Sequence, residues 1–403
     1  MTSENYTYTR RDFFKKAGTA GASAIIAPGI LNAADKTGSG QENTIPLRPF
    51  GKTGVTIPIL SLGGGFDIST NQIIVNVATK WGITYFDTAH EYGGGLSEIG
   101  IGKYIKAHPD NRKNLFIVTK SKTRETERLS TELGMSLQRM NTDYIDLYFL
   151  HDVGNINELS GDIRKWVDAQ KQKGAIRLFG FSTHNNMERC MMDASKLDWV
   201  DGIMMSYNFR LMHHPEMNDA VQACFEKGIG LTAMKTQGGG SVKMETDSEH
   251  ELAAGFIKQG FTLEQAKLKA VWEDKRISSI CSLMTNSTIL MANIAAAMDR
   301  KRLTATDMKR LRRYACDTSS SYCAGCGYIC ESVFNGSAPI STVMRNLMYH
   351  RSYGDKGFSG VLDKKLAADI KRMSSLDFSS AEKKCPQNMP IGQLMKEATL
   401  LLA

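Results

Sequence analysis

The chain has 403 residues and a net charge of +8, and 42% of its residues are hydrophobic and 23% charged. This length accommodates one large α/β domain with a sizeable core and a smaller second unit. No apolar run reaches the roughly 18 residues that a membrane span needs, and the basic residues occur without a nucleic-acid motif or interleaved aromatic residues. The sequence therefore argues against a transmembrane protein and a nucleic-acid-binding protein.

Residues 1–34 have the features of a twin-arginine export signal. The pair Arg10-Arg11 is followed by two phenylalanines and a lysine, then by a weakly apolar stretch over residues 17–30 and a cleavable small-residue site at Ala33-Ala34. The alternative, a first helix of the fold, is disfavoured by the glycines and the proline of this stretch. Residues 35–45 form a polar linker. We expect a periplasmic protein with the twin-arginine translocase as a partner, and that pathway transports proteins already folded, often around a cofactor.

Residues 46–315 carry the pattern of a parallel sheet with crossover helices. Short β-branched runs alternate with longer segments whose apolar residues recur at helical spacing. The eight predicted strands are Ile59–Leu62, Thr84–Asp87, Leu115–Thr119, Tyr144–Leu150, Ile176–Phe181, Gly202–Ser206, Gly230–Ala233 and Ser278–Leu283. Eight such strands predict a closed α/β barrel of the (β/α)8, or TIM-barrel, class.

Four polar side chains stand at or after the ends of successive predicted strands. Asp87 ends the second strand, Tyr92 lies in the loop that follows, Lys120 follows the third strand and His151 the fourth. Each alone has an ordinary structural explanation, such as a helix cap or a core histidine. Because the loops after the strands of such a barrel share one open mouth, their joint placement predicts a catalytic site.

These four residue types suit carbonyl reduction by hydride transfer. The reaction needs a proton donor for the oxygen that becomes negative in the transition state. Tyr92 can donate if a cation lowers its pKa from the usual value of about 10; Lys120, held by Asp87, would supply that charge. His151 would hydrogen-bond the substrate oxygen or relay the proton.

The runs around these residues resemble the aldo-keto reductase family in order and spacing, over residues 46–345. They are Phe86-Asp87-Thr88-Ala89-His90-Glu91-Tyr92-Gly93, Val118-Thr119-Lys120, Phe149-Leu150-His151 and the segment 176–182. Residues 50–54 look like the family's N-terminal hairpin. The resemblance implies NAD(P)-dependent carbonyl reduction or alcohol oxidation with Tyr92 as the general acid, acting on a small carbonyl compound, sugar or polyol.

The resemblance also implies where the nicotinamide binds, with two departures. The family holds the nicotinamide amide with Ser-Asn after the fifth strand and a glutamine on the sixth, where this chain has Ser182-Thr183 and Met204. Met234 replaces the aromatic residue that stacks on the ring. Threonine can still hydrogen-bond, but methionine cannot replace the glutamine donor. We expect Ser182, Thr183 and Lys235 to contact the cofactor.

The adenosine end of the cofactor is implied at a later segment. Thr285, Asn286 and Asn293 are its expected polar contacts, while Ile289 stands where an arginine commonly binds the 2′-phosphate. The sequence therefore does not separate NAD from NADP. The glycine run at residues 238–240 offers backbone N–H groups that suit a pyrophosphate.

A cysteine segment follows the barrel. Cys323, Cys326 and Cys330 have the spacing C-x2-C-x3-C and, with the glycine run, resemble a subgroup of the family that has a ferredoxin-like C-terminal extension. The usual cluster pattern is C-x2-C-x2-C-x3-C-P, so the fourth ligand of a [4Fe–4S] cluster would come from a distance. It would be Cys385, which precedes a proline, or else Cys316. Two disulfides and a structural zinc site are the alternatives.

We assign residues 316–403 to this extension. Within residues 361–403 the sequence predicts two helices, from apolar side chains at helical spacing: Leu362, Leu366, Ile370 and Met373. Two functions then compete. One is an exported nicotinamide-dependent oxidoreductase, with a redox partner for the cluster. The other is an iron–sulfur electron-transfer or binding protein whose barrel has lost nicotinamide binding.

Overall fold

The computed structural model describes residues 44–239, 247–353 and 364–402. The predicted export signal and almost all of the linker lie outside these ranges. The first described residues already belong to the fold, since Ile45 is buried and its N–H donates to the Trp81 carbonyl over 3.0 Å. None of the helices in the described ranges is long and apolar enough to cross a membrane.

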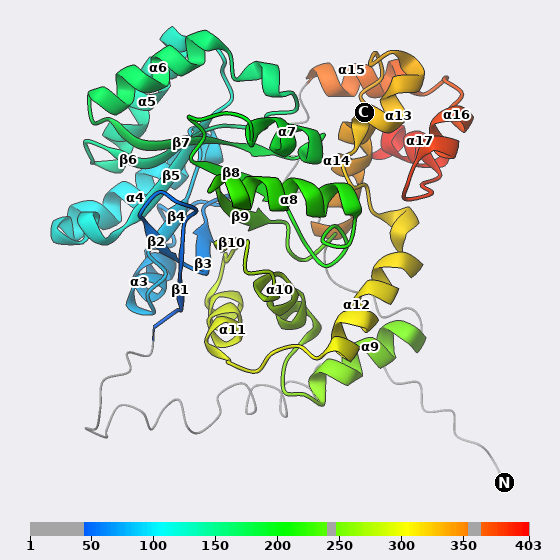
Figure 1. Cartoon of the computed structure of the whole chain (residues 1–403), viewed down its shortest axis with the longest axis horizontal. Coiled ribbons are helices and arrows are strands. Elements are labelled where there is room, and N and C mark those ends of the chain that lie inside the picture. Colours follow the sequence, from blue (N-terminus) through cyan, green and yellow to red (C-terminus); the bar gives the residue numbers. More distant parts are fainter. Residues whose placement is uncertain (1–43, 240–246, 354–363, 403) are drawn as a thin grey trace. The chain divides into compact units, whose positions relative to one another are not determined.

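Eight parallel strands form a closed barrel, as the sequence predicts (Figure 1). Around the barrel their order is β10, β3, β4, β5, β6, β7, β8 and β9. Their bounds are β3 Leu60–Gly63, β4 Tyr85–Asp87, β5 Phe116–Ser121, β6 Ile145–Leu150, β7 Ile176–Thr183, β8 Gly202–Ser206, β9 Gly230–Met234 and β10 Ser279–Leu283. All eight predicted strands are present within one or two residues at each end.

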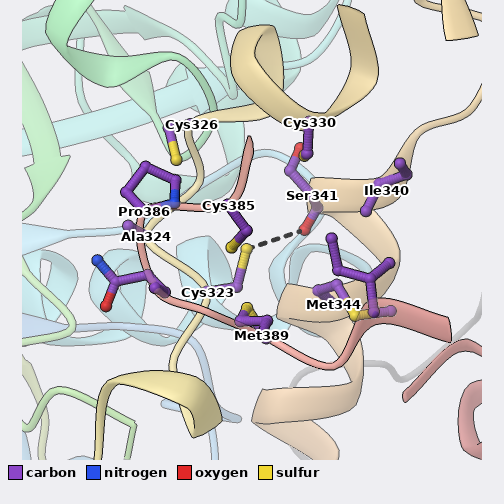
Figure 2. A pocket seen from close by; sticks show the side chains of 12 residues that line it. Cys323, Ala324, Cys326, Cys330, Ile340, Ser341, Met344, Cys385, Pro386 and Met389 are labelled. Atoms are coloured by element: carbon purple, nitrogen blue, oxygen red, sulfur yellow. Dashed lines mark hydrogen bonds between the residues drawn. The ribbon is translucent and has the colours of Figure 1, made fainter. Parts of the chain in front are cut away.

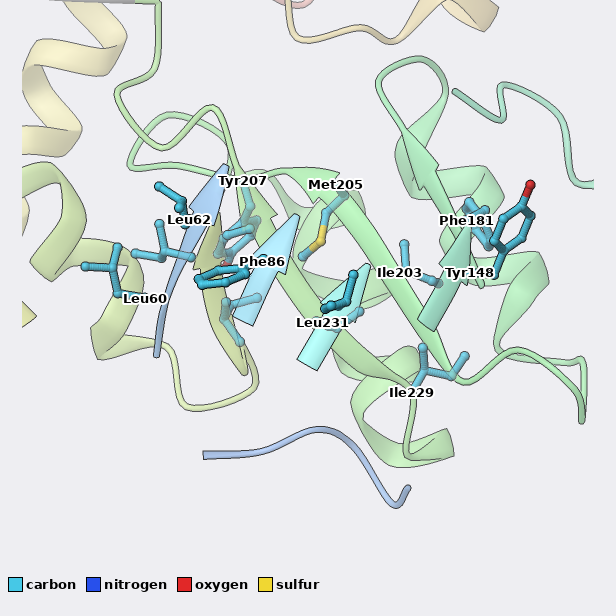
Figure 3. Packing of buried hydrophobic residues seen from close by; sticks show 14 of the residues in the cluster. Leu60, Leu62, Phe86, Tyr148, Phe181, Ile203, Met205, Tyr207, Ile229 and Leu231 are labelled. Carbon is cyan, nitrogen blue, oxygen red and sulfur yellow. The ribbon is translucent and has the colours of Figure 1, made fainter. Parts of the chain in front are cut away.

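Alternation along these strands builds two apolar layers. Ile203 and Met205 of β8 belong to the large cluster between the strands and the surrounding helices, while Met204 belongs to the cluster that contains the interior residue Phe149. Figure 3 shows the outer layer, with side chains such as Phe86 and Leu231 standing off the strands. Successive strand side chains point to opposite faces, so both layers follow from sequences that are apolar at almost every position.

An N-terminal hairpin precedes the barrel. Strands β1 (Leu47–Pro49) and β2 (Thr56–Pro58) pair antiparallel, as the likeness of residues 50–54 to a hairpin implies. Phe50 in its turn is fully buried in the interior cluster with Phe116, whose ring centroid lies 5.6 Å away. The hairpin therefore supplies side chains to the barrel interior.

Helices connect consecutive strands and alternate with them along the chain. They are α3 Gln72–Lys80, α4 Leu96–Ala107, α5 Thr126–Met140, α6 Gly161–Gln172, α7 Met187–Ala194, α8 Pro215–Lys227, α9 Asp247–Ile257 and α10 Leu263–Glu273; α11 Ser287–Met298 follows the last strand. Helix α9 belongs to a separate cluster that also includes Leu263 of α10 and Leu311 of α12 (Ala305–Asp317).

The C-terminal residues form a helical unit with its own apolar cluster. Its helices are α13 Gly327–Cys330, α14 Ile340–Tyr353, α15 Lys364–Met373, α16 Ser379–Lys384 and α17 Ile391–Leu402. Buried residues from all five helices, among them Met344 and Ile370, share one cluster that also contains Cys323. The prediction of two helices after residue 361 is wrong, because three are present. Short α16 lacks an apolar repeat long enough to read from sequence, and Leu362 lies outside the described ranges.

Candidate active site

The four predicted catalytic side chains meet at the carboxyl end of the barrel. Lys120 Nζ lies 2.7 Å from Asp87 Oδ1 and donates to the Thr88 carbonyl, also over 2.7 Å. The same ammonium lies 5.0 Å from the centre of the Tyr92 ring, and the rings of Tyr92 and His151 meet edge to face at 5.8 Å. Lys120 and Asp87 are almost completely buried. The arrangement is a desolvated ion pair beneath a phenol and an imidazole.

The electrostatics of Tyr92 correct one expectation from the sequence. Burial raises the pKa of the Tyr92 phenol, and the charge of Lys120 opposes this only in part, while Asp87 adds to the rise. We expected Lys120 to lower this pKa overall. It acts in that direction, but desolvation outweighs it. Burial would also lower the pKa of Lys120, yet Asp87 more than compensates and raises it. The lysine is therefore charged and the phenol keeps its proton.

Glu91 is a site residue that the sequence reasoning did not single out. Its Oε1 lies 2.6 Å from His151 Nδ1, which fixes one nitrogen of that ring. Burial would raise the pKa of Glu91, but His151 and Lys122 lower it to about 2. Its position directly before Tyr92 was the available signal. Glu91 is thus an ionised partner that orients His151.

A tight glycine turn positions Tyr92. The phenol stands at the start of a short 3-10 turn, Tyr92–Gly95, and Gly95 at its end has a φ of +99°. A Cβ at Gly95 would lie 2.6 Å from Arg139 Cζ, and that arginine bonds the His90 carbonyl and Glu98 Oε2. Only glycine fits there, so the loop closes against α5 and places Tyr92 at the mouth.

The expected nicotinamide contacts lie on the rim of the same mouth. Ser182 and Thr183 end β7 and are almost fully buried; Ser182 Oγ accepts from the Asp152 N–H and the Thr183 hydroxyl donates to the Asn185 carbonyl. Met204 and Met234 are buried in the interior cluster. Both hydroxyl groups are therefore buried and already hydrogen-bonded, and Ser182 pairs in register with Met204 of β8.

Lys235 follows β9 directly and extends this rim. Burial lowers the pKa of Lys235 to about 7, and the charge of Arg345 acts in the same direction. His184, next to Thr183, has its pKa lowered by burial and by four bases, with Arg345 and Lys235 the strongest. The loop after β7 is therefore surrounded by basic side chains, which favours an anionic group beside it.

The expected adenosine contacts form a separate group at α11. Asn286 caps this helix, with its side chain accepting from the Ile289 N–H over 3.0 Å, and Thr285 beside it is exposed. Asn293 Nδ2 donates to Ser282 Oγ over 2.9 Å, which ties α11 to β10. The two asparagines thus already have structural partners, while the helix N-terminus is exposed.

The glycine run predicted for a pyrophosphate packs against the C-terminal unit. The Gly238 carbonyl accepts from Arg210 Nε over 2.8 Å, and a Cβ at Gly239 would lie 3.3 Å from the Tyr322 ring. Gly240 lies outside the described ranges. Tyr322 in turn accepts from Asn208 Nδ2 over 2.9 Å. The C-terminal unit therefore reaches the loop where the pyrophosphate was expected.

The predicted cysteine ligands line a single cavity. Figure 2 shows Cys323 and Cys385 near its centre with Cys326 and Cys330 beside them, among apolar side chains such as Met344 and Met389. Burial raises the pKa of the Cys323 thiol to about 11. Cys316 is exposed on α12 and is not among the lining residues. Of the two proposed fourth ligands, the fold brings Cys385 to the other three.

All eight cysteines lie in the described ranges, and all are free thiols. The alternative of two disulfides is therefore not present in this structure. Across the described ranges, no group of three or more cysteine, histidine or acidic side chains is arranged to hold one metal ion. The cluster and the zinc site remain predictions, and what the cavity provides is four reduced sulfurs in apolar surroundings.

The cysteine segment docks on the loop between β7 and α7. The Asn186 N–H donates to the Gly325 carbonyl over 2.8 Å, and Asn186 Oδ1 accepts from the Tyr328 N–H over 2.9 Å. Gly325 has a φ of +83°, and a Cβ there would lie 2.5 Å from the His184 carbonyl oxygen. The cysteine cavity and the Ser182–Thr183 end of β7 are therefore joined by one short loop.

Comparison with known proteins agrees with this geometry. Residues 60–312, more than half of the chain, match the aldo/keto reductase family. The protein therefore belongs to that family and is an oxidoreductase. The match ends before Cys316, so the cysteine segment lies beyond it.

The following relatives are distant in sequence, but each match covers most of the relative's own length. The chain is 24% identical to an L-galactose dehydrogenase of Arabidopsis thaliana over 64% of this chain and 90% of that protein. It is 30% identical to the aldo-keto reductase yakc of Schizosaccharomyces pombe, whose name specifies NADP(+). That match covers 54% of this chain and 68% of the relative. Among solved structures, the holo form of aldo-keto reductase AKR11C1 from Bacillus halodurans superposes with a TM-score of 0.56 at 21% identity. The superposition covers 67% of this chain and 96% of that chain, and it shows a similar fold.

Proposed function

We propose that the protein is an exported oxidoreductase that interconverts a small carbonyl compound and its alcohol by hydride transfer with a nicotinamide cofactor. The observation that carries this proposal is the buried Lys120–Asp87 pair, at 2.7 Å, directly beneath Tyr92 and beside His151. A small carbonyl-bearing sugar or polyol-derived molecule suits a mouth built from polar side chains. The family assignment supports the class of reaction.

Each residue of the mouth has a defined task in reduction. A reduced nicotinamide, when bound, supplies a hydride to the carbonyl carbon. Tyr92 donates its phenolic proton to the carbonyl oxygen, and the Lys120 charge stabilises the phenolate that remains. Asp87 keeps Lys120 charged and in place. His151, oriented by Glu91, holds the substrate oxygen or relays the proton. Alcohol oxidation uses the same groups in reverse.

Ser182, Thr183 and Lys235 would hold the cofactor, and Lys235 gives the binding a pH dependence. Its pKa of about 7 means that it is charged below neutral pH and neutral above it. Charge-assisted hydrogen bonds contribute about 1.5–3 kcal/mol, so we expect the Kd for NAD⁺ to rise about tenfold as pH increases from 6 to 9. Titration followed by protein fluorescence measures this. Lys235→Met should bind more weakly and with no such dependence; an unchanged pH profile in that variant would refute the role.

The cysteine cavity is the proposed site of a [4Fe–4S] cluster bound by Cys323, Cys326, Cys330 and Cys385. The donor set fits, because four free thiols, three from the cysteine segment and one from Cys385, line one apolar cavity. The thiolates of a cubane cluster bind four different iron atoms, so they need not converge on one point as zinc ligands do. Such a cluster supplies one-electron transfer, and an external electron carrier would be its partner.

Iron and nucleotide analysis of anaerobically purified protein tests both cofactors. Protein folded in the cytoplasm should show broad absorbance near ~400 nm with about four irons per chain, and should release NAD(H) or NADP(H) if the nucleotide is retained. Cys385→Ser should lose the iron, whereas Cys316→Ser, at an exposed cysteine, should keep it. Iron-free wild-type protein would remove the cluster from the proposal.

Export by the twin-arginine pathway is part of the proposal and rests on the Arg10-Arg11 segment. A cluster installed in the cytoplasm would explain a route that carries folded proteins. Free NAD(P)H is scarce outside the cytoplasm, so the enzyme would retain its nucleotide, recycle it on one substrate or pass electrons to the cluster. Fractionation of cells that express the chain with and without Arg10→Lys and Arg11→Lys tests the location.

One observation favours the second function, an electron-transfer or binding protein on a barrel without nicotinamide. Buried Met204 and Met234 provide neither an amide donor nor a stacking ring. The intact Asp87–Lys120 pair and Tyr92 favour the enzyme. The second function would be established if the purified protein contained iron, released no nucleotide and bound neither NAD⁺ nor NADP⁺ detectably.

A further inference from the structure

Arg345 lies between the cysteine segment and the barrel mouth. It is on α14, only 9% of it is exposed, and its Nη1 donates to the His184 carbonyl and to Asn185 Oδ1, both neutral oxygens. Within the described ranges its Nε is buried without a hydrogen-bond partner. The buried guanidinium therefore bonds neutral oxygens through Nη1, whereas its Nε has no hydrogen-bond partner in the described ranges.

The side chain packs between the loop after β7 and the cysteine segment. Its Cδ lies 3.6 Å from the position that a Cβ of Gly325 would take, so its stem packs against the cysteine segment. Burial would lower the pKa of Arg345, but Tyr349, Asp152 and Cys323 raise it. On the other side its charge contributes to the lowered pKa of His184. The guanidinium remains charged, and its field reaches Cys323 as well as the loop after β7.

A charge in this position has a direct consequence for a redox group in the cavity. A cluster held by four thiolates is an anion, and it gains one more negative charge when it is reduced. Its potential depends on net charge, on hydrogen bonds to sulfur and on solvent exposure. In a buried site a nearby cation is weakly screened, so it stabilises the reduced form more than the oxidised form.

We propose that Arg345 is a positioning residue that raises the reduction potential of the cluster while fixing the loop after β7 beside it. This inference rests on the proposed cluster site. The same side chain thereby holds the redox group next to the rim formed by Ser182 and Thr183, with its charge between the two sites.

The test is a potentiometric titration of the iron-loaded protein followed by its absorbance and electron paramagnetic resonance. In Arg345→Gln the one-electron equilibrium should shift at least about tenfold toward the oxidised cluster, which corresponds to about 59 mV. Arg345→Lys keeps the charge and should stay close to wild type. Arg210→Gln is the matched control, because Arg210 is also buried between the barrel and the C-terminal unit but bonds Gly238 and Thr318.

Arg345→His provides a second test that remains informative if Arg345→Gln does not fold. Its charge can be removed by pH alone, so its potential should fall as pH rises through the histidine pKa, more steeply than that of wild type. A wild-type potential in Arg345→Gln, or equal shifts in the Gln and Lys variants, would overturn the inference. Iron-free wild-type protein would instead show that the proposed cluster itself is wrong.

Discussion

We expect Tyr92→Phe to lower kcat by about 10²–10⁴-fold, because it removes the phenolic proton beside Lys120 and His151, and general acid catalysis contributes about that much. The ring still packs against His151, which lies 5.8 Å away, and Lys120 keeps its partner Asp87. Nucleotide affinity and the unfolding midpoint should therefore stay unchanged. Steady-state rates with a panel of aldehydes and ketones, together with NADPH or NADH, measure the effect.

Tyr104→Phe is the control for this substitution. Tyr104 is a buried tyrosine of α4 that bonds Asn111 through its hydroxyl and belongs to the layer between strands and helices. It should leave the rates within about twofold of wild type, since its hydroxyl contributes only about 1 kcal/mol to stability. Wild-type turnover in Tyr92→Phe would rule out the general-acid role.

Lys120→Met should both abolish turnover and destabilise the barrel by about 3–5 kcal/mol, the usual cost of breaking a buried ion pair. Methionine fills the space, but Asp87 then remains as a buried carboxylate without its cation, at 3% exposure. Urea denaturation followed by circular dichroism measures the loss of stability. Adding Asp87→Asn should recover most of the stability while activity stays absent.

A surface pair provides the matched comparison. Lys165 and Asp162 are 3.3 Å apart, and both side chains are 82% exposed. Lys165→Met should change stability by about 0–1 kcal/mol, because water screens exposed pairs. A similarly small loss in Lys120→Met would mean that the buried pair does not hold the site together.

Much of the barrel and the catalytic group followed from local patterns. Strands such as Ile145–Leu150 are apolar at nearly every position and are bounded by polar turns, which marks a buried parallel strand. Once eight such strands are found, topology places Asp87, Lys120 and His151 at one end. The prediction for Tyr92 failed in one respect, because the pKa of a phenol depends on how completely its surroundings exclude water, and no local pattern reports that.

The sequence by itself determined the types of the catalytic residues and their order along the strands, because hydrophobic periodicity predicts the barrel and the barrel determines which strand ends meet. Tertiary structure alone decided that Cys385 rather than Cys316 joins the other cysteines, that Glu91 pairs with His151 and that Arg345 stands between the two sites. These contacts join residues from different elements, Arg345 and Asn185 being 160 positions apart, so they arise only when packing brings remote segments together.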